Sequence, residues 1–377
     1  MTTVMTSRLS RCGRAAAIAF ALLLSASVSM PVSVARANSG ASPSASAAAV
    51  DRVDARGGGD DAEARDIDAA DPSPWHEEPV TVGAEGWALP GILTRPAAGP
   101  AKASVVLVHG SGPHDADQTI FGNKPFRDLA EGFARHGIAS LRYVKRSREH
   151  AARLAAQADA LTVREEVIDD AVAAVAFLQS ADGVPGAPVF LLGHSLGGFL
   201  APRIAHETED LSGVIVMAGN ARPLEDLVLE QVRKLASAQG ITEAQIAAME
   251  TQRGNVKALA RGDAVDGPLL LNLPASYWRD LSQYDAVATA RQLGMPMLFV
   301  QGERDYQVTL ADLAAWREGL AARADVQLRS YPALNHLFIA GDGPSSPAEY
   351  LTPGRMEARV IDDIANWILD TDTETQL

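Results

Sequence analysis

The sequence Val189-Phe190-Leu191-Leu192-Gly193-His194-Ser195-Leu196-Gly197-Gly198 decides the fold. Its first four residues are apolar and predict a buried strand, and the helical pattern of Phe199 to Ala205 follows at once. The turn between them has the form G-x-S-x-G, where glycines let the backbone fold back on itself and a Cβ would clash. We therefore expect Ser195 to be exposed as a nucleophile, with the Leu196 N–H aimed at the same point. A purely structural turn is the alternative.

The first 37 residues have the features of an export signal. Three arginines between positions 8 and 14 make a basic start, and residues 15–28 form an uncharged apolar run. Ala35-Arg36-Ala37 then fits the small-x-small pattern that signal peptidase recognises. A membrane anchor is the alternative, but the run is shorter than the ~20 residues that a bilayer span needs. We expect cleavage after Ala37 and an exported protein, periplasmic or extracellular, without a stable membrane anchor.

Residues 38–74 consist mostly of Ala, Ser, Gly, Asp and Pro, with almost no large apolar side chain. Such a segment cannot bury enough surface to offset the cost of ordering it, so we expect a disordered linker. One folded domain is expected over residues 75–377. Cys12 is the only cysteine and would leave with the signal, so the mature chain would have neither a disulfide nor a cysteine nucleophile.

The net charge of the chain excludes some classes of binding partner. Removing residues 1–37 leaves 29 Lys and Arg against 47 Asp and Glu, a formal net charge of −18. Such a surface repels nucleic acid and anionic membranes, so neither is expected as a partner. No histidine pair stands at metal-ligand spacing on a predicted helix, and no glycine-rich turn ends in the Gly-Lys-Ser/Thr of a phosphate-binding loop. We expect neither a metal nor a cofactor.

Apolar runs typical of strands alternate with amphipathic helices along most of the domain. This alternation predicts a mostly parallel, doubly wound α/β sheet, with two antiparallel edge strands at residues 79–82 and 87–95. The alternation stops between about 220 and 285, where inserted helices are expected to form a lid over the site. Capping boxes at Thr162–Glu165 and Thr242–Gln245 predict two helix starts, the first opening a long helix. The remaining expected strands are 103–108, 138–143, 189–192, 211–217, 296–300 and 326–331, and the remaining helices include 126–136, 310–320 and 355–368.

A serine hydroxyl needs a base, and imidazole is the side chain suited to that task near neutral pH. Of the eight histidines, His336 stands in a loop after a predicted strand, at the carboxyl edge where α/β folds place ligands. We take His336 as the base. Asp305 follows the preceding strand and is the expected acid, with Glu303 as the competitor nearer to the strand. The chain order Ser, Asp, His is the one associated with α/β-hydrolases.

A second N–H for a developing oxyanion is expected in the loop of residues 109–115, which follows the strand at 103–108. Ser111 is the expected donor, and Gly112 is the alternative. A structural glycine turn would be the simpler interpretation of this loop. His109 and His114 could orient the loop or the substrate, and neither is expected to be catalytic.

Seven segments carry a resemblance to a known family. From residue 75 to the end, the chain resembles α/β-hydrolases. More narrowly, it resembles the secreted or periplasmic bacterial hydrolases grouped with serine aminopeptidases, acyl esterases and dienelactone-hydrolase-like proteins. The matching segments are HGSGPHDAD (109–117), NKPFRDLA (123–130), TVREEVIDDA (162–171), GHSLGG (193–198), NARPLEDLVLEQ (220–231), GERDYQV (302–308) and YPALNHLF (331–338).

The resemblance implies cleavage of small carboxylic esters, typically with short acyl chains, through an acyl-enzyme. Ser195, Asp305 and His336 fall on the family's triad positions, and the loop after residue 109 falls on its oxyanion loop. One departure is that relatives usually carry an aspartate where this chain has Val144. The salt bridges normally made there, and the path of residues 147–161, are therefore open.

Two other functions stay open at the level of the sequence. The first is that of a serine aminopeptidase or an acyltransferase, which would use the same triad. An aminopeptidase would need an acidic pair for the substrate ammonium, and Glu225, Asp226 and Glu230 in the lid offer one unless they form a solvated helix face. The other function is that of a binding protein on a hydrolase scaffold, since fold does not dictate function.

The expected partner is therefore a small-molecule ester, and its pocket is expected to be lined from the lid. Tyr277, Trp278 and Tyr284 are the residues predicted to line it. The alternative for each of them is packing the lid onto the core.

Overall fold

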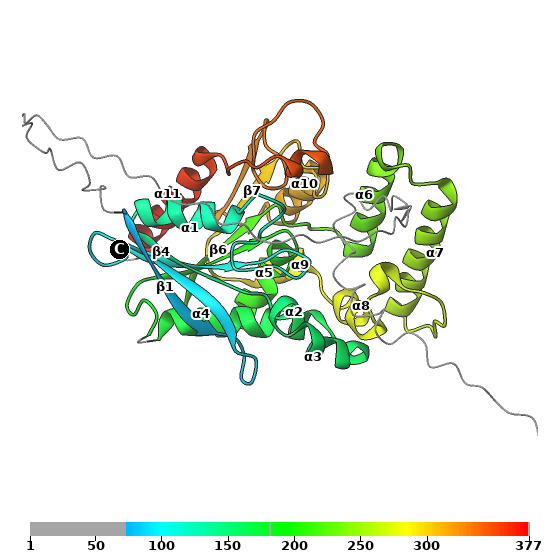
Figure 1. Cartoon of the computed structure of the whole chain (residues 1–377), viewed down its shortest axis with the longest axis horizontal. Coiled ribbons are helices and arrows are strands. Elements are labelled where there is room, and N and C mark those ends of the chain that lie inside the picture. Colours follow the sequence, from blue (N-terminus) through cyan, green and yellow to red (C-terminus); the bar gives the residue numbers. More distant parts are fainter. Residues whose placement is uncertain (1–72, 181, 376–377) are drawn as a thin grey trace, which may run out of the picture. The chain divides into compact units, whose positions relative to one another are not determined.

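The computed structural model describes residues 73–180 and 182–375, which cover nearly all of the expected folded domain (Figure 1). The expected signal peptide and all but the last two residues of the expected linker lie outside the described residues. In the part of the chain that is described, no helix is both long and apolar enough to cross a membrane.

An eight-stranded sheet in the order β1-β2-β4-β3-β5-β6-β7-β8 forms the centre of the domain. β1 is antiparallel to β2 and β2 to β4, while all other neighbours are parallel. This confirms the predicted mostly parallel α/β sheet, but only β1 of the first two strands is an edge. The strands are β1 (Trp75–Val82), β2 (Leu89–Pro96), β3 (Ala103–Val108), β4 (Ile138–Tyr143), β5 (Val189–His194), β6 (Leu211–Met217), β7 (Met297–Gly302) and β8 (Val326–Tyr331).

Helices cover both faces of this sheet, because its central strands are apolar on both sides. In β3, Val105 faces one hydrophobic cluster and Val106 the other, as the alternation of a strand requires. The first face is covered by α1 (Pro125–Arg135) and α11 (Ala358–Thr375), which lie across the sheet from α4 in Figure 1. The other face is covered by α4 (Asp169–Gln179), α5 (Leu196–His206), α9 (Ala286–Gln292) and α10 (Leu310–Gly319).

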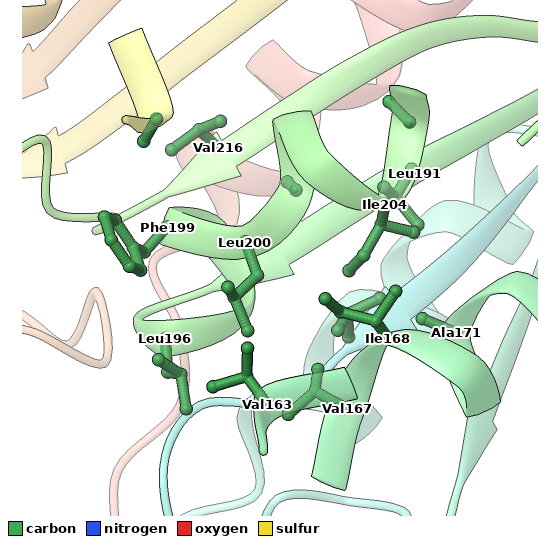
Figure 2. Packing of buried hydrophobic residues seen from close by; sticks show 14 of the residues in the cluster. Val163, Val167, Ile168, Ala171, Leu191, Leu196, Phe199, Leu200, Ile204 and Val216 are labelled. Atoms are coloured by element: carbon green, nitrogen blue, oxygen red, sulfur yellow. The ribbon is translucent and has the colours of Figure 1, made fainter. Parts of the chain in front are cut away.

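The helix after the G-x-S-x-G turn is anchored in the second of these layers. Leu200 and Ile204 of α5 point toward the segment that leads into α4, where Val163 and Ile168 meet them (Figure 2). All four side chains are fully buried. The turn in front of α5 is therefore held by close packing on its helical side.

The interval predicted as a lid contains three helices and a short 3₁₀ turn. They are α6 (Leu224–Gln239), α7 (Glu243–Ala260), η3 (Leu270–Asn272) and α8 (Ala275–Ser282), which lie together at one end of the domain (Figure 1). Leu229, Val232 and Ile246 join α6 to α7. Thr242 and Gln245 form the expected capping box at the start of α7.

Residues 147–161, whose path the sequence left open, continue from α2 (Arg146–Glu149) through α3 (Ala151–Ala156) and η1 (Ala158–Ala160). The cations beside Val144 have other partners. Arg142 bonds Asp117 at 2.9 Å, and Arg146 bonds the buried Asp170 at 2.8 Å. This segment is thus held by carboxylates from elsewhere in the chain.

Candidate active site

Ser195 sits between β5 and α5 in a strained backbone conformation, with φ of 56° and ψ of −118°. Such a conformation is costly for a residue with a side chain and persists only where the surroundings impose it. A Cβ at Gly193 would lie 2.1 Å from the Gly197 oxygen, and a Cβ at Gly197 would lie 2.3 Å from the Val108 oxygen. The glycines are therefore required by close backbone approach, and the serine is raised above the edge of the sheet.

His336 and Asp305 lie in the loops after β8 and β7, at the same edge of the sheet as Ser195. The His336 Nδ1 and the Asp305 Oδ2 are 2.6 Å apart, and both residues are buried. The backbone N–H groups of Gln307 and Val308 donate to the other carboxylate oxygen at 2.7 and 3.0 Å. Asp305 is thereby fixed to accept from Nδ1, which leaves Nε2 of the imidazole free to act as a base.

Glu303, the competing acid, points elsewhere. Its carboxylate accepts a hydrogen bond from the Ser330 hydroxyl at 2.7 Å on the exposed side of the loop. The structure brings Asp305, and not Glu303, to the imidazole.

The glycine-rich loop after β3 passes directly over the serine. A Cβ at Gly110 would lie 3.1 Å from the Ser195 Cβ, so only a glycine gives the loop this approach. The Gly110 N–H donates to the Gln118 Oε1 at 2.8 Å, and the His114 Nε2–H donates to the Ser111 carbonyl at 2.7 Å. Within the described residues, the N–H of Ser111 and that of Leu196 have no hydrogen-bond partner. Both are therefore available to a bound oxyanion.

A cavity of about 200 Å³ opens above this arrangement. Ser195, Leu196, Ser111 and His336 all line it, with Asp305 behind the imidazole. Part of its wall comes from α6, η3 and α8, and from the 3₁₀ helix η4 (Pro347–Leu351), which carries Tyr350. The wall residues include Leu224, Leu227, Gln231, Leu271, Leu273 and Tyr277.

Of the three aromatic residues predicted to line the pocket, only Tyr277 does so. Trp278 does not line the cavity, because its ring is buried in the core and its Nε1–H donates to the Leu270 carbonyl at 3.2 Å. Tyr284 also lies outside the cavity. It packs edge-on against Phe199 and donates its hydroxyl hydrogen to the carbonyl of that residue at 2.7 Å. Both are packing residues, which corrects the prediction.

Two buried histidines hold the surroundings of the triad in place. The His194 Nε2–H donates to the His336 carbonyl at 2.9 Å, while Gln118 donates to the His194 Nδ1 at 2.8 Å. His109 Nε2–H donates to the Asp115 carbonyl at 3.0 Å. Burial lowers the pKa of both histidines well below the usual range, so both are neutral at physiological pH.

Gln118, Lys145 and Glu166 are site residues that the sequence analysis did not single out. Gln118 and Glu166 line the cavity, and Lys145 pairs with Glu166 at 2.8 Å. Burial raises the pKa of Glu166, but the Lys145 ammonium and the hydrogen bonds to the carboxylate outweigh this and leave it below its usual value. A lone lysine and a glutamate 21 residues later have no spacing that would have revealed the pair.

Among the described residues, no cluster of three or more His, Cys, Asp or Glu side chains could hold a metal ion.

A strained serine between a buried strand and a helix is the nucleophile position of α/β-hydrolases, and this protein is a hydrolase of that class. The chain belongs to the serine aminopeptidase family S33, whose model matches residues 99–342.

One relative with a known name supports this assignment, and two solved structures are similar at lower identity. Esterase EstD from Thermotoga maritima is 40% identical over 304 residues, which are 80% of this chain and 69% of that protein. Est1E from Butyrivibrio proteoclasticus has a TM-score of 0.50 at 16% identity, over 78% of this chain and 99% of that one. Dienelactone hydrolase from Anabaena variabilis has a TM-score of 0.48 at 17% identity, over 79% and 98% of the two chains. At 16% identity, the likeness to Est1E concerns the fold alone.

Proposed function

We propose that this carboxylesterase cleaves small esters with short acyl chains through an acyl-enzyme formed on Ser195. The observation that carries the proposal is convergence in one cavity. The nucleophile, the imidazole that is held by Asp305, and two unpartnered backbone N–H groups line or adjoin the same space of about 200 Å³.

The first half of the reaction follows from this geometry. His336 Nε2 takes the proton of Ser195 as Oγ attacks the acyl carbonyl, and Asp305 stabilises the imidazolium that forms. The oxyanion is held by the N–H groups of Leu196 and Ser111. The tetrahedral intermediate then expels the alcohol, which takes its proton from the imidazolium, and the acyl-enzyme remains.

In the second half of the reaction, water hydrolyses the acyl-enzyme with the help of the same groups. His336 removes a proton from the water as it attacks the acyl carbonyl, and the same two N–H groups hold the second oxyanion. Collapse of this intermediate returns the proton to Ser195 Oγ and releases the carboxylic acid.

The size of the cavity supports short acyl chains. A volume of about 200 Å³ lies below the ~300–1,000 Å³ that is usual for sites of drug-sized ligands. Leucines of the lid interval, among them Leu224, Leu227 and Leu273, contribute apolar surface to the lining of this cavity, which suits a short acyl chain.

A chain-length series of p-nitrophenyl esters tests the substrate class, with kcat/KM measured from acetate to decanoate. We expect the maximum among the short acyl chains and a steep fall beyond it, and a maximum at decanoate would contradict the proposal. The Ser195→Ala variant should lose at least about 10⁴-fold in kcat. Wild-type turnover by that variant would refute the serine mechanism.

Aminopeptidase activity receives no support from the acidic lid residues. Asp226 is paired with Arg253 and Lys257, and Glu230 is paired with two cations. None of the three lid carboxylates lines the cavity, and Glu166, which does, is already neutralised by Lys145. We therefore expect turnover of p-nitrophenyl acetate to exceed that of alanine p-nitroanilide by orders of magnitude. Preference for the anilide would reverse this assignment.

We also propose that residues 1–37 direct export of the protein. The basic start, the apolar run and the Ala35-Arg36-Ala37 motif support this. Expression of the full chain in a Gram-negative host should yield periplasmic or secreted protein whose N-terminal sequence begins at Asn38. Protein that stays in the cytoplasm with its N-terminus intact would contradict the proposal.

A further inference from the structure

The lysine behind the glycine-rich loop is buried without serving any step of the mechanism above. Lys145 is only 2% exposed. Its ammonium donates to the Gly110 carbonyl at 2.9 Å and pairs with the Glu166 Oε1 at 2.8 Å. Burying an ammonium is costly unless it is paired and hydrogen-bonded, so these two contacts account for its position.

The contact between Lys145 and the Gly110 carbonyl affects the direction of the Ser111 N–H group. The peptide bond between Gly110 and Ser111 is trans, so its carbonyl and its N–H point in opposite directions from one rigid plane. Lys145 holds the carbonyl, and Lys145 does not itself line the cavity. The N–H on the opposite side of the plane, that of Ser111, therefore points away from Lys145, and Ser111 itself lines the cavity.

The loop needs such a restraint because of its composition. Gly110 lacks a side chain that would restrict its backbone, and Gly112 has a φ of 102°. A peptide that follows a glycine can rotate at lower cost, because no Cβ restricts the ψ of that glycine. Rotation of the Gly110–Ser111 peptide would replace a donor to the oxyanion with a carbonyl oxygen that repels it.

A hydrogen-bond chain connects this restraint to the lid. Tyr277 of α8 donates to the Glu166 Oε2 at 2.7 Å, and the other oxygen of the same carboxylate holds Lys145. Glu166 reaches both partners from a single π-helical turn, η2 (Arg164–Ile168), that precedes α4. Such turns insert one residue and are frequent at functional sites.

We propose that Lys145 is a positioning residue for catalysis, which holds the Gly110 carbonyl so that the Ser111 N–H stays directed at the oxyanion. Glu166 and Tyr277 keep Lys145 in place from the side of the lid. This inference rests on the proposed serine mechanism, and it assigns to Lys145 no contact with the substrate.

Lys145→Met in the full chain is the central test. It should lower kcat for p-nitrophenyl acetate by about 10²-fold, the value of one oxyanion donor, with KM within about threefold. A short alkyl trifluoromethyl ketone, which adds to Ser195 as a tetrahedral oxyanion, should bind weaker by a similar factor. The matching methyl ketone, which carries no oxyanion, should bind as before. Lys145→Arg keeps a cation that can donate and should recover most of the kcat.

The neighbouring buried cation provides the matched control. Arg146 is 1% exposed and pairs with Asp170, without any hydrogen bond to the glycine-rich loop. Arg146→Met should lower the melting temperature of the folded enzyme while kcat stays within about threefold of wild type. If both methionine variants lose kcat in proportion to their melting temperature, and both ketones weaken equally, Lys145 is merely structural and the inference is wrong.

If Lys145→Met does not fold, Glu166→Gln is the variant to test, because glutamine keeps the shape of the side chain. Glutamine carries no charge to hold the Lys145 ammonium, so we expect kcat to fall about tenfold at constant KM. Unchanged kcat would overturn the inference. Ser195→Ala separates this from the mechanism itself: if that variant is inactive and the Lys145 or Glu166 variant is not, only the positioning role fails.

Discussion

Asp305 and Glu303 follow the same strand two residues apart, yet only one carboxylate reaches the imidazole. The difference lies in the backbone after the strand, where a turn directs the N–H groups of Gln307 and Val308 at the aspartate. A shorter side chain at the turn itself fits this geometry, whereas Glu303 is nearer to the strand and leans toward Ser330.

Replacing each carboxylate by its amide separates their roles. Asp305→Asn leaves the packing nearly unchanged but favours the wrong tautomer of His336, so kcat should fall by about 10⁴-fold. Glu303→Gln is the matched control and should stay within about threefold of wild type in kcat for p-nitrophenyl acetate. Equal losses in the two variants would mean that the imidazole has another acid.

The positions of the proposed nucleophile, base and acid could be predicted because each follows a strand in the sequence, and parallel strands bring their carboxyl ends to one edge. Nothing local marks Gln118, Lys145 or Glu166 in the same way. Their positions depend on which loop packs against which, and that is decided by tertiary contacts such as the 2.8 Å pair between Lys145 and Glu166.

Among the secondary-structure elements, the helix that was expected to start at Thr162 differs from its prediction in how it begins. Only half of the expected capping box forms: the Thr162 N–H donates to the Glu165 carboxylate at 2.8 Å, but the Thr162 hydroxyl accepts from the Arg164 N–H at 3.1 Å and not from that of Glu165. The next turn, however, is π-helical, and α4 begins only at Asp169. The extra residue allows Glu166 to reach Lys145 while Val167 and Ile168 still pack on α5 (Figure 2). A pattern of apolar residues cannot show this, because a distant ion pair decides it.

The turn between β5 and α5 leads to a prediction about two glycines. Gly197→Ala would place a Cβ 2.3 Å from the Val108 oxygen and 2.6 Å from the His109 oxygen, and backbone atoms of a central strand cannot move aside. We expect this variant to be insoluble, or to lose more than about 3 kcal/mol of stability, as measured by urea unfolding.

Gly254 in the middle of α7 is the control for that substitution. A Cβ there would have no heavy atom within 4 Å, and its φ is not positive. Gly254→Ala should therefore stabilise the protein, by about 0.5–1 kcal/mol, through the lower backbone entropy of the unfolded chain. A tolerated alanine at position 197 would show that the turn does not approach β3 as closely as described.

For the whole molecule, alternating apolar runs were sufficient to predict the sheet, since burial on both faces imposes a pattern along each strand. The aromatic residues of the lid show the limit of such patterns. Trp278 and Tyr284 have the same composition signal as Tyr277, but they turn toward the core, where the Leu270 and Phe199 carbonyls accept their hydrogen bonds. Tyr277 and Trp278 are neighbours in α8, so the rotation of this helix about its axis decides which of the two rings lines the cavity.

Buried histidines make the stability of the whole domain depend on pH. Burial lowers the pKa of His109, His114 and His194, and that of His114 falls to about 4. All three are neutral in the folded protein at pH values where the unfolded chain, with pKa near ~6.5, already takes up protons. The unfolded state thus binds more protons below about pH 6.5, so the free energy of unfolding must fall as the pH falls.

The pH dependence can be tested by measuring urea unfolding of the wild type and of His114→Gln between pH 7.5 and 4. The glutamine amide can still donate to the Ser111 carbonyl, as the imidazole does. Lys145, Asp115 and Glu166 surround the wild-type imidazole, and burial has the largest effect on it. The variant should lose less stability than the wild type on acidification, by about 1.4 kcal/mol per pH unit between roughly pH 6 and 4.5. The exposed His206, replaced by glutamine, controls for the substitution itself. Parallel curves for His114→Gln and wild type would show that this histidine is not held neutral by the fold.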